Sequence, residues 1–377
     1  MTELDTAAAL RAAFGEPSPP TVGLEEEVML LDADTLDLAP RAVELLGRLG
    51  GDPRYRLELP ASQLEIVLPP GARVGDAALG LGAARARLAE ALGGVVRLAV
   101  AGTHPFAGAE GEVNRGERYD RLVADYGSLA RRQLVCALQV HVAIRGPDRA
   151  LAVYNAMRCH LPEIAAMAAN APFHAGRDTG LASVRPLIAQ LLPRQGVPPR
   201  LDSWEVLAEQ LDWGARTGAV PEPRSWWWEL RPNPAFGTLE VRVPDAQTTV
   251  AEAAGVAAVV QCLAAALAQR HDAGEPLPAA PTWRIAENRS AALRGGLDGL
   301  LVDLDSGLRQ PARERLDALL GELSPTAERL GCAPELARAR SGLDAGPARR
   351  QREAAAHAGV RGAAAWLAER FLEGLQR

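Results

Sequence analysis

Five stretches of the chain alternate apolar and polar residues with a period of two. Successive side chains of a β-strand point to opposite faces, so each stretch predicts a strand with one buried face and one polar face. A sheet built from such strands is most often antiparallel. The predicted strands lie within residues 21–32, 61–70, 133–144, 226–232 and 238–244.

Helical patterns separate these strands and dominate the second half of the chain. Residues 76–94 and 148–170 have the apolar spacing of helices, and a further strand is predicted at 95–104. After residue 250 the chain is Ala-rich and predicts helices to its end, interrupted by a Pro-rich loop at 274–282.

The pattern predicts one large domain with short additions at both ends. Residues 1–20 predict a short helix and a Pro-rich lead-in, 21–345 a single catalytic domain, and 346–377 a helical tail on the surface. Gly, Pro and Asn punctuate residues 170–186, which predicts a loop of the kind that carries functional residues.

The first predicted strand contains three consecutive carboxylates. Alternation places Glu25 and Glu27 on one face and Glu26 on the other face, with Leu24 and Val28. For Glu26, on the apolar side, we expect a buried arginine partner. Parallel carboxylates on one face repel each other unless a cation lies between them, and both a divalent metal and an arginine remain open.

The polar faces of the five strands carry related chemistry. Together they predict a floor of acids, one amide and one imidazole, fringed by arginines: Glu25, Glu27, Glu65, Gln139, His141 and Glu240, with Arg231 and Arg242. Such ligands suit Mg²⁺ or Mn²⁺, and arginines beside these ions suit a nucleoside triphosphate. Taken singly, each residue also fits a core hydrogen bond or an ordinary ion pair.

The composition excludes several classes of protein. The chain has 377 residues, 48% of them hydrophobic, and a dispersed net charge of −6, so we expect no nucleic-acid partner. We find no uninterrupted apolar run of 18 residues and no signal peptide, and therefore expect no membrane span. The cysteines are widely spaced and form no C-x-x-C pair, which favours a reducing cytoplasm: Cys136, Cys159, Cys262 and Cys332.

All 41 basic residues of the chain are arginine. The absence of lysine excludes a Schiff-base lysine and a Walker A loop. Any anion bound by cationic side chains must therefore be bound mainly by arginine, whose planar fork suits phosphate oxygens.

Six motifs in the first two thirds of the chain, and a weaker one after them, have a recognisable order. They are "GLEEEVML", "ELPASQLEI", "AGTHPFA", "DYGSLARRQLVCALQVHV", "NAPFHAGRDTGLASVRP" and "LRPNPAFGTLEVRVPD", followed by "ENRSAALRGGLDGLLVD" at 287–303. In this set the chain resembles the type 2 glutamate–cysteine ligases, or carboxylate–amine ligases, of the glutamine-synthetase-like superfamily. The resemblance implies an α+β fold: a curved antiparallel sheet with one polar, metal-lined face and helices packed on the other.

The resemblance also implies roles for individual residues. It implies metal ligands at Glu25, Glu27, Glu58, Glu65, Gln139 and Glu240. It implies catalytic arginines at Arg242, Arg231 and Arg185, and cofactor-binding residues at Arg242, Tyr119 and His141.

Three positions depart from the family pattern. Gln139 stands where members commonly have histidine, although plant-type members also carry glutamine there. His174 and Ser290 stand where members commonly have tryptophan. We expect the last two changes to reshape the pocket for the amine acceptor.

The activity implied by the resemblance is an ATP-dependent carboxylate–amine ligase that forms an amide or γ-glutamyl bond through an acyl phosphate. Its expected ligands are Mg²⁺ or Mn²⁺, ATP, a small carboxylate such as glutamate, and cysteine or another amine. A metal-dependent amide hydrolase and a non-catalytic protein that binds nucleotide or amino acid are the alternatives. The Ala-rich helices after residue 250 could supply a homo-oligomer interface.

Overall fold

The computed structural model describes residues 6–15, 20–220 and 225–375. Within them, seven strands form an antiparallel sheet in the order β2-β3-β1-β5-β9-β8, and β4 pairs with the C-terminal half of β1. The strands are β1 (Val22–Asp32), β2 (Tyr55–Leu57), β3 (Gln63–Val67), β4 (Val96–Ala99), β5 (Leu138–Ala143), β8 (Leu230–Asn233) and β9 (Thr238–Val241). The predicted α+β class and antiparallel sheet are confirmed.

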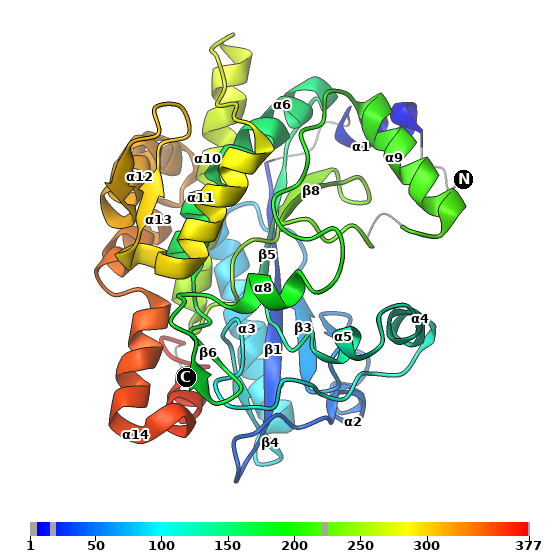
Figure 1. Ribbon diagram of the computed structural model, residues 1–377, viewed down its shortest axis with the longest axis vertical. Helices are drawn as coiled ribbons and strands as arrows, with labels where there is room; N and C mark the ends of the chain where they lie inside the picture. The colour runs from blue at the N-terminus through cyan, green and yellow to red at the C-terminus, as the bar shows by residue number, and fades with distance from the viewer. Residues whose placement is uncertain (1–5, 16–19, 221–224, 376–377) are drawn as a thin grey trace.

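Helices surround this sheet. In Figure 1 the helices that follow residue 250 lie on the left of the central strands, and α4 and α5 lie on the right. The α-helices are α1 (Ala7–Gly15), α2 (Ala42–Gly47), α3 (Val74–Leu92), α4 (Glu117–Tyr126), α5 (Ser128–Arg131), α6 (Pro147–Met157), α7 (Leu161–Ala168), α8 (Arg185–Ala189), α9 (Trp204–Thr217), α10 (Val250–Asp272), α11 (Thr282–Gly295), α12 (Ala312–Leu330), α13 (Ala333–Ser341) and α14 (Pro347–Glu369). The short 3₁₀ helices are η1 (Arg158–His160), η3 (Gly296–Asp298) and η4 (Gly342–Asp344).

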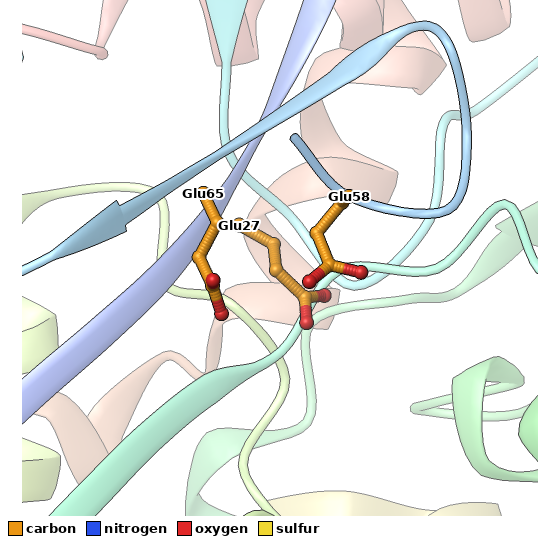
Figure 2. Close-up of side chains that lie close together, drawn as sticks. All are labelled: Glu27, Glu58 and Glu65. Carbon is orange, nitrogen blue, oxygen red and sulfur yellow. The ribbon is translucent and has the colours of Figure 1, made fainter. Parts of the chain in front are cut away.

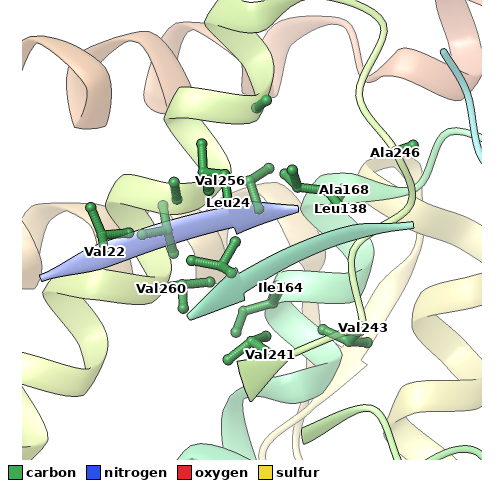
Figure 3. Close-up of a cluster of buried hydrophobic side chains, with 14 of the residues drawn as sticks. Val22, Leu24, Leu138, Ile164, Ala168, Val241, Val243, Ala246, Val256 and Val260 are labelled. Atoms are coloured by element: carbon green, nitrogen blue, oxygen red, sulfur yellow. The ribbon is translucent and has the colours of Figure 1, made fainter. Parts of the chain in front are cut away.

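The apolar face of the sheet packs against helices and forms the main core. Leu24 of β1 and Leu138 of β5 lie close to Val256 and Val260 of α10 in this cluster (Figure 3), and Ile164 of α7 adds to it. Each of these side chains is almost completely buried. Burying a side chain of this size contributes about 1.5–3 kcal/mol, so this face holds the polar face in place.

Helix α10 is the longest apolar segment of the protein. Its mean hydropathy of 1.9 and its 23 residues would suffice to cross a membrane by length and composition alone. The expectation of no membrane span did not anticipate this helix. However, 78% of the most apolar 18-residue stretch of this helix is buried inside the fold, as in the core helix of a soluble protein. A capping box between Thr249 and Glu252 fixes its first turn.

Glu26 has the buried arginine partner that its apolar position predicted. Arg85 of α3 donates to both carboxylate oxygens of Glu26, at 2.6 and 2.8 Å, and both side chains are completely buried. The same guanidinium donates to the backbone carbonyls of Gln247, Thr248 and Phe371. One ion pair therefore joins the first strand, α3, the approach to α10 and the C-terminal segment.

Several predicted strands are shorter in the structure. The segment 133–144 becomes a strand only at Leu138, because the Ala137 amide donates to the Glu27 side chain. The segment 226–232 becomes a strand only at Leu230. The segment 95–104 ends as a strand at Ala99, beyond which the Gly102 amide donates to the Asn170 carbonyl.

Two short hairpins and one kinked helix add to the elements that the sequence predicted. The strands β10 (Leu300–Val302) and β11 (Arg309–Pro311) form a hairpin inside the region predicted as helical. Another hairpin, β6 (Phe173–His174) with β7 (Arg177–Asp178), lies within the predicted loop. The tail is helical as α14, which is kinked at Ala358 and Gly359.

The two ends of the described chain join the main core. Leu10 of α1, together with Leu367 and Phe371 in and after α14, belongs to the same hydrophobic cluster as the sheet. The predicted lead-in falls partly on residues 1–5 and 16–19, which lie outside the described residues. The proposed domain boundaries at residues 20 and 345 stay a prediction.

Candidate active site

The polar face of the sheet is the floor of an open pocket of about 540 Å³. Its walls come from the β2–β3 loop, from α4 and from the turn between β8 and β9. Eight residues predicted from the sequence line this one pocket: Glu25, Glu27, Glu58, Glu65, Gln139, Arg231, Glu240 and Arg242. Alternation along five strands thus identified most of the floor, because antiparallel pairing aligns polar faces from distant parts of the chain.

Three carboxylates cluster at the centre of the floor. Glu27 and Glu65 are direct cross-strand neighbours in β1 and β3, and Glu58 comes from the loop before β3. One carboxylate oxygen of each lies within 4.8 Å of the other two, and Figure 2 shows the three carboxyl groups close together. Asn114 holds the loop by donating to the Glu58 carbonyl at 2.6 Å.

The electrostatics of this trio favour a cation. Burial and the charge of Glu58 raise the pKa of Glu27 to about 7, although the Ala137 amide donates to it at 2.7 Å. Burial, followed by the charges of Glu58, Glu25 and Glu27, raises the pKa of Glu65 well above its ordinary value. None of the three forms an ion pair with a described arginine. A divalent ion with oxygen ligands would relieve this repulsion, and the donor set therefore fits Mg²⁺ or Mn²⁺.

The acids farther along the sheet already have protein partners. Arg231 donates to both oxygens of Glu240 at 2.9 Å, and Asn233 and Arg242 also donate to this carboxylate. Burial alone would raise the pKa of Glu240, but the charges of Arg231 and Arg242 hold it far below its ordinary value. Arg242 also donates to the Gln139 side chain, so its guanidinium is fixed at the pocket wall.

Glu25 is paired with histidine. Its carboxylate lies 3.4 Å from Nε2 of His141. Burial would raise the pKa of Glu25, yet the hydrogen bond and charge of His141 leave it lower than usual. Nδ1 of the same ring lies 3.1 Å from the Thr238 hydroxyl. His141 is thus buried on the polar face, beside Glu240 of the neighbouring strand, and is not among the described residues that line the pocket.

Two other residues that were given roles by the resemblance, Arg185 and Tyr119, also lie outside the described lining of the pocket. Arg185 donates to Asp245 at 2.6 Å and to the Val243 carbonyl at 2.6 Å, and it is almost completely buried. Tyr119 donates to the Leu57 carbonyl at 2.8 Å. Neither belongs to the described lining. Their hydrogen bonds fix two backbone segments, and residues next to those segments in the chain line the pocket.

Two of the departures from the family pattern lie away from this lining. His174 belongs to the β6–β7 hairpin, and Ser290 of α11 accepts a hydrogen bond from Arg294 on the helix surface. Among the described residues, neither lines the pocket. The expectation that both would reshape an acceptor pocket stays a prediction.

Sequence reasoning missed several residues of the site. Asn233 is the last residue of β8 and donates to Glu240, while Arg56 and Arg118 line the wall next to the acid trio. The turn motif "NPAFG" could have indicated Asn233. A three-residue strand carries no periodicity that would identify Arg56, and Arg118 stands among other helical arginines.

Two solved structures share this fold. The crystal structure of a glutamate–cysteine ligase from Francisella tularensis in complex with AMP matches with a TM-score of 0.67 at 12% identity, covering 96% of this chain and 90% of that one. A bifunctional glutathione synthetase from Pasteurella multocida matches with a TM-score of 0.67 at 16% identity, covering 98% of this chain and 53% of that one. At these identities the likeness concerns the fold.

The chain belongs to the glutamate–cysteine ligase family 2, whose family model matches residues 21–365. A relative from Rubrobacter xylanophilus, provisionally named glutamate–cysteine ligase 2-3, is 40% identical over 334 residues, which are 87% of this chain and 90% of the relative. Another from Thermobifida fusca, provisionally named glutamate–cysteine ligase 2, is 38% identical over 331 residues, 86% of this chain and 83% of the relative. The family consists of ATP-dependent ligases that resemble glutamate–cysteine ligase, and the predicted family is confirmed.

Proposed function

We propose that the protein is an ATP-dependent carboxylate–amine ligase that joins glutamate to cysteine or another amine. One observation carries the proposal: three acids that form no ion pair with any arginine in the described part of the chain share a pocket with two arginines held in place by Glu240. Family membership and the names of the relatives support the reaction class and the substrates.

Glu27, Glu58 and Glu65 would hold one Mg²⁺ or Mn²⁺, and Glu25, Gln139 and Glu240 are the proposed ligands of a second. Such ions supply neutralising charge to the phosphates of ATP and to the phosphoryl group in transfer. The raised pKa of Glu27, about 7, fits this role because a bound cation favours the ionised carboxylate.

Arg242 and Arg231 stabilise negative charge on the transferring phosphoryl group. Their donors are oriented before substrate binds, since Glu240 and Gln139 hold Arg242 and Glu240 holds Arg231 through two hydrogen bonds. Donors fixed in advance are the most effective form of electrostatic stabilisation. Arg185 acts as a positioning residue, since it binds the backbone carbonyls of residues 242 and 243.

The proposed reaction has two steps. A carboxylate oxygen of the donor attacks the γ-phosphorus of ATP, which forms an acyl phosphate and releases ADP. The amine nitrogen then attacks the activated carbonyl carbon, phosphate leaves, and the nitrogen loses a proton to give an amide. The pocket orients both substrates and limits access of water to the acyl phosphate. No enzyme nucleophile is needed, in keeping with four cysteines that are all buried.

The alternatives have less support. An amide hydrolase could use the acid trio with water, but it would have no use for paired arginines beside the trio. A non-catalytic binding protein would not require three mutually repelling carboxylates. We further propose a cytoplasmic location, in keeping with the four free cysteines, and a homo-oligomer formed through the Ala-rich helices after residue 250.

The test is ADP release by the purified protein with Mg²⁺, ATP, glutamate and a panel of amines that includes cysteine. Mass spectrometry would detect the condensed product. We expect amine-dependent ADP release and a new amide, both abolished in Glu27→Ala. Failure of the wild-type protein to bind Mg²⁺–ATP would overturn the proposal.

A further inference from the structure

Two arginines of the pocket wall have no acidic partner among the described residues. Arg56 of β2 and Arg118 of α4 both line the pocket, and both side chains are exposed. The guanidinium carbon of Arg118 lies 5.8 Å from the centroid of the Tyr119 ring. Arg231 and Arg242 differ from them, because both already form ion pairs with Glu240.

The fold brings Arg56 and Arg118 to the same wall. Arg56 is the direct cross-strand neighbour of Glu65, so it stands on the same face of the sheet as the acid trio. Tyr119 donates to the Leu57 carbonyl at 2.8 Å and so ties α4 to β2. Arg118 precedes Tyr119 and Arg56 precedes Leu57, so both residues that line the pocket adjoin this hydrogen bond in the chain.

The order of strands separates two kinds of arginine. β2 is one edge of the sheet and β8 is the other, with the acid trio on β1, β3 and the loop before β3. Arg231 and Arg242 therefore lie toward the β8 edge, and Arg56 lies toward the β2 edge. An anionic substrate whose reacting end lies at the trio extends toward one edge of the sheet. Its other end then lies near the arginines of the β8 edge or near those of the β2 edge.

We propose that Arg56 and Arg118 bind the second, non-reacting carboxylate of the donor and thereby restrict the donor to dicarboxylic acids. The proposal rests on the proposed ligase function and adds to it the residues that select the donor. A planar guanidinium without a partner binds a carboxylate through two parallel hydrogen bonds. Phosphate oxygens of ATP have the proposed ions, together with Arg231 and Arg242 toward the β8 edge of the sheet.

The test compares Arg56→Gln and Arg118→Gln with wild type, using glutamate and 4-aminobutyrate as alternative donors. 4-Aminobutyrate keeps the reacting carboxylate and lacks the other one. We expect each variant to raise KM for glutamate by about 10- to 100-fold, as for a lost hydrogen bond to a charged group. KM for ATP should stay within about twofold of wild type, and the preference for glutamate over 4-aminobutyrate should collapse.

Arg121→Gln is the matched control, because Arg121 lies on the same helix, pairs with Glu117 at 3.5 Å and does not belong to the described lining. It should leave both KM values unchanged. A raised KM for ATP with unchanged KM for glutamate would overturn the proposal and assign the pair to the triphosphate. Equal loss with glutamate and 4-aminobutyrate would also overturn it.

Binding separates failure of this inference from failure of the ligase function. If wild type shows no turnover, glutamate binding is measured by thermal shift with Mg²⁺ and a non-hydrolysable ATP analogue. Stabilisation by glutamate that disappears in both variants and persists in Arg121→Gln would support the donor site. The absence of stabilisation by glutamate in wild type would overturn it, whereas absent binding of the nucleotide would overturn the ligase function.

Discussion

At the scale of single residues, the acid trio is the feature with the greatest electrostatic strain. Glu27 has a pKa of about 7 in the folded protein against an ordinary value of 4.5, and the pKa of Glu65 is raised as well. A carboxyl group whose pKa is raised by folding stabilises the fold below its unfolded pKa. That contribution is lost as pH rises through the folded pKa.

This strain predicts how stability depends on pH and metal. In EDTA, the melting temperature should fall between pH 6 and pH 8, because Glu27 ionises without a cation beside it. Mg²⁺ should raise the melting temperature more at pH 8 than at pH 6, because it binds the ionised acids. Differential scanning fluorimetry measures both effects.

Glu27→Gln is the control for this prediction. It removes the titrating group while keeping the shape of the side chain, so the difference between pH 6 and pH 8 in EDTA should shrink. An unchanged difference in the variant would mean that other groups cause it.

At the scale of elements, the pair Glu26–Arg85 joins segments that are distant in sequence. A buried pair broken by removal of one partner leaves a charge without compensation. Arg85 also binds three backbone carbonyls, so its position affects β1, α3 and the C-terminal segment together. The polar floor depends on this pair, since Glu25 and Glu27 flank Glu26 on β1.

Glu26→Gln should therefore lower the free energy of unfolding by about 3–5 kcal/mol. Urea denaturation followed by circular dichroism is the measurement. The matched control is Glu44→Gln, since Glu44 and Arg41 form an exposed pair that should contribute less than about 1 kcal/mol. Equal losses of unfolding free energy in both variants would contradict the prediction that the buried pair contributes more to stability than the exposed pair.

At the scale of the whole molecule, the C-terminal segment is part of the main core. Phe371 is 3% exposed and lies over Arg85, whose guanidinium carbon is 5.0 Å from the ring centroid. Its carbonyl also accepts a hydrogen bond from Arg85. The fold therefore depends on residues beyond the predicted domain boundary at 345.

Phe371→Ala should lower the free energy of unfolding by about 3–5 kcal/mol, as for a buried aromatic residue. Leu372→Ala, which truncates the adjacent side chain that is 41% exposed, should have a much smaller effect. Chemical denaturation of both variants measures the difference. Similar stability of Phe371→Ala and wild type would support an independent tail after residue 345.

The sequence by itself determined the polar faces. Period-two alternation identified the residues that share one polar surface: Glu25, Glu27, Glu65, Gln139 and Glu240. The position of Glu26 on the apolar side of β1 predicted its arginine partner. These features are local, since a strand's geometry decides which side chains share a face. Family motifs added Glu58, which lies in a loop where no periodicity acts.

Only the tertiary structure decided which groups meet across the pocket and which lie behind it. Arg85 is 59 residues from Glu26, and Arg118 reaches the wall through a hydrogen bond from Tyr119 to a strand more than 60 residues away. The structure also left Arg185 and His141 buried and outside the described lining, and it ended several predicted strands early. Such contacts depend on the packing of helices against the sheet, a sum of many distant interactions that no local pattern encodes.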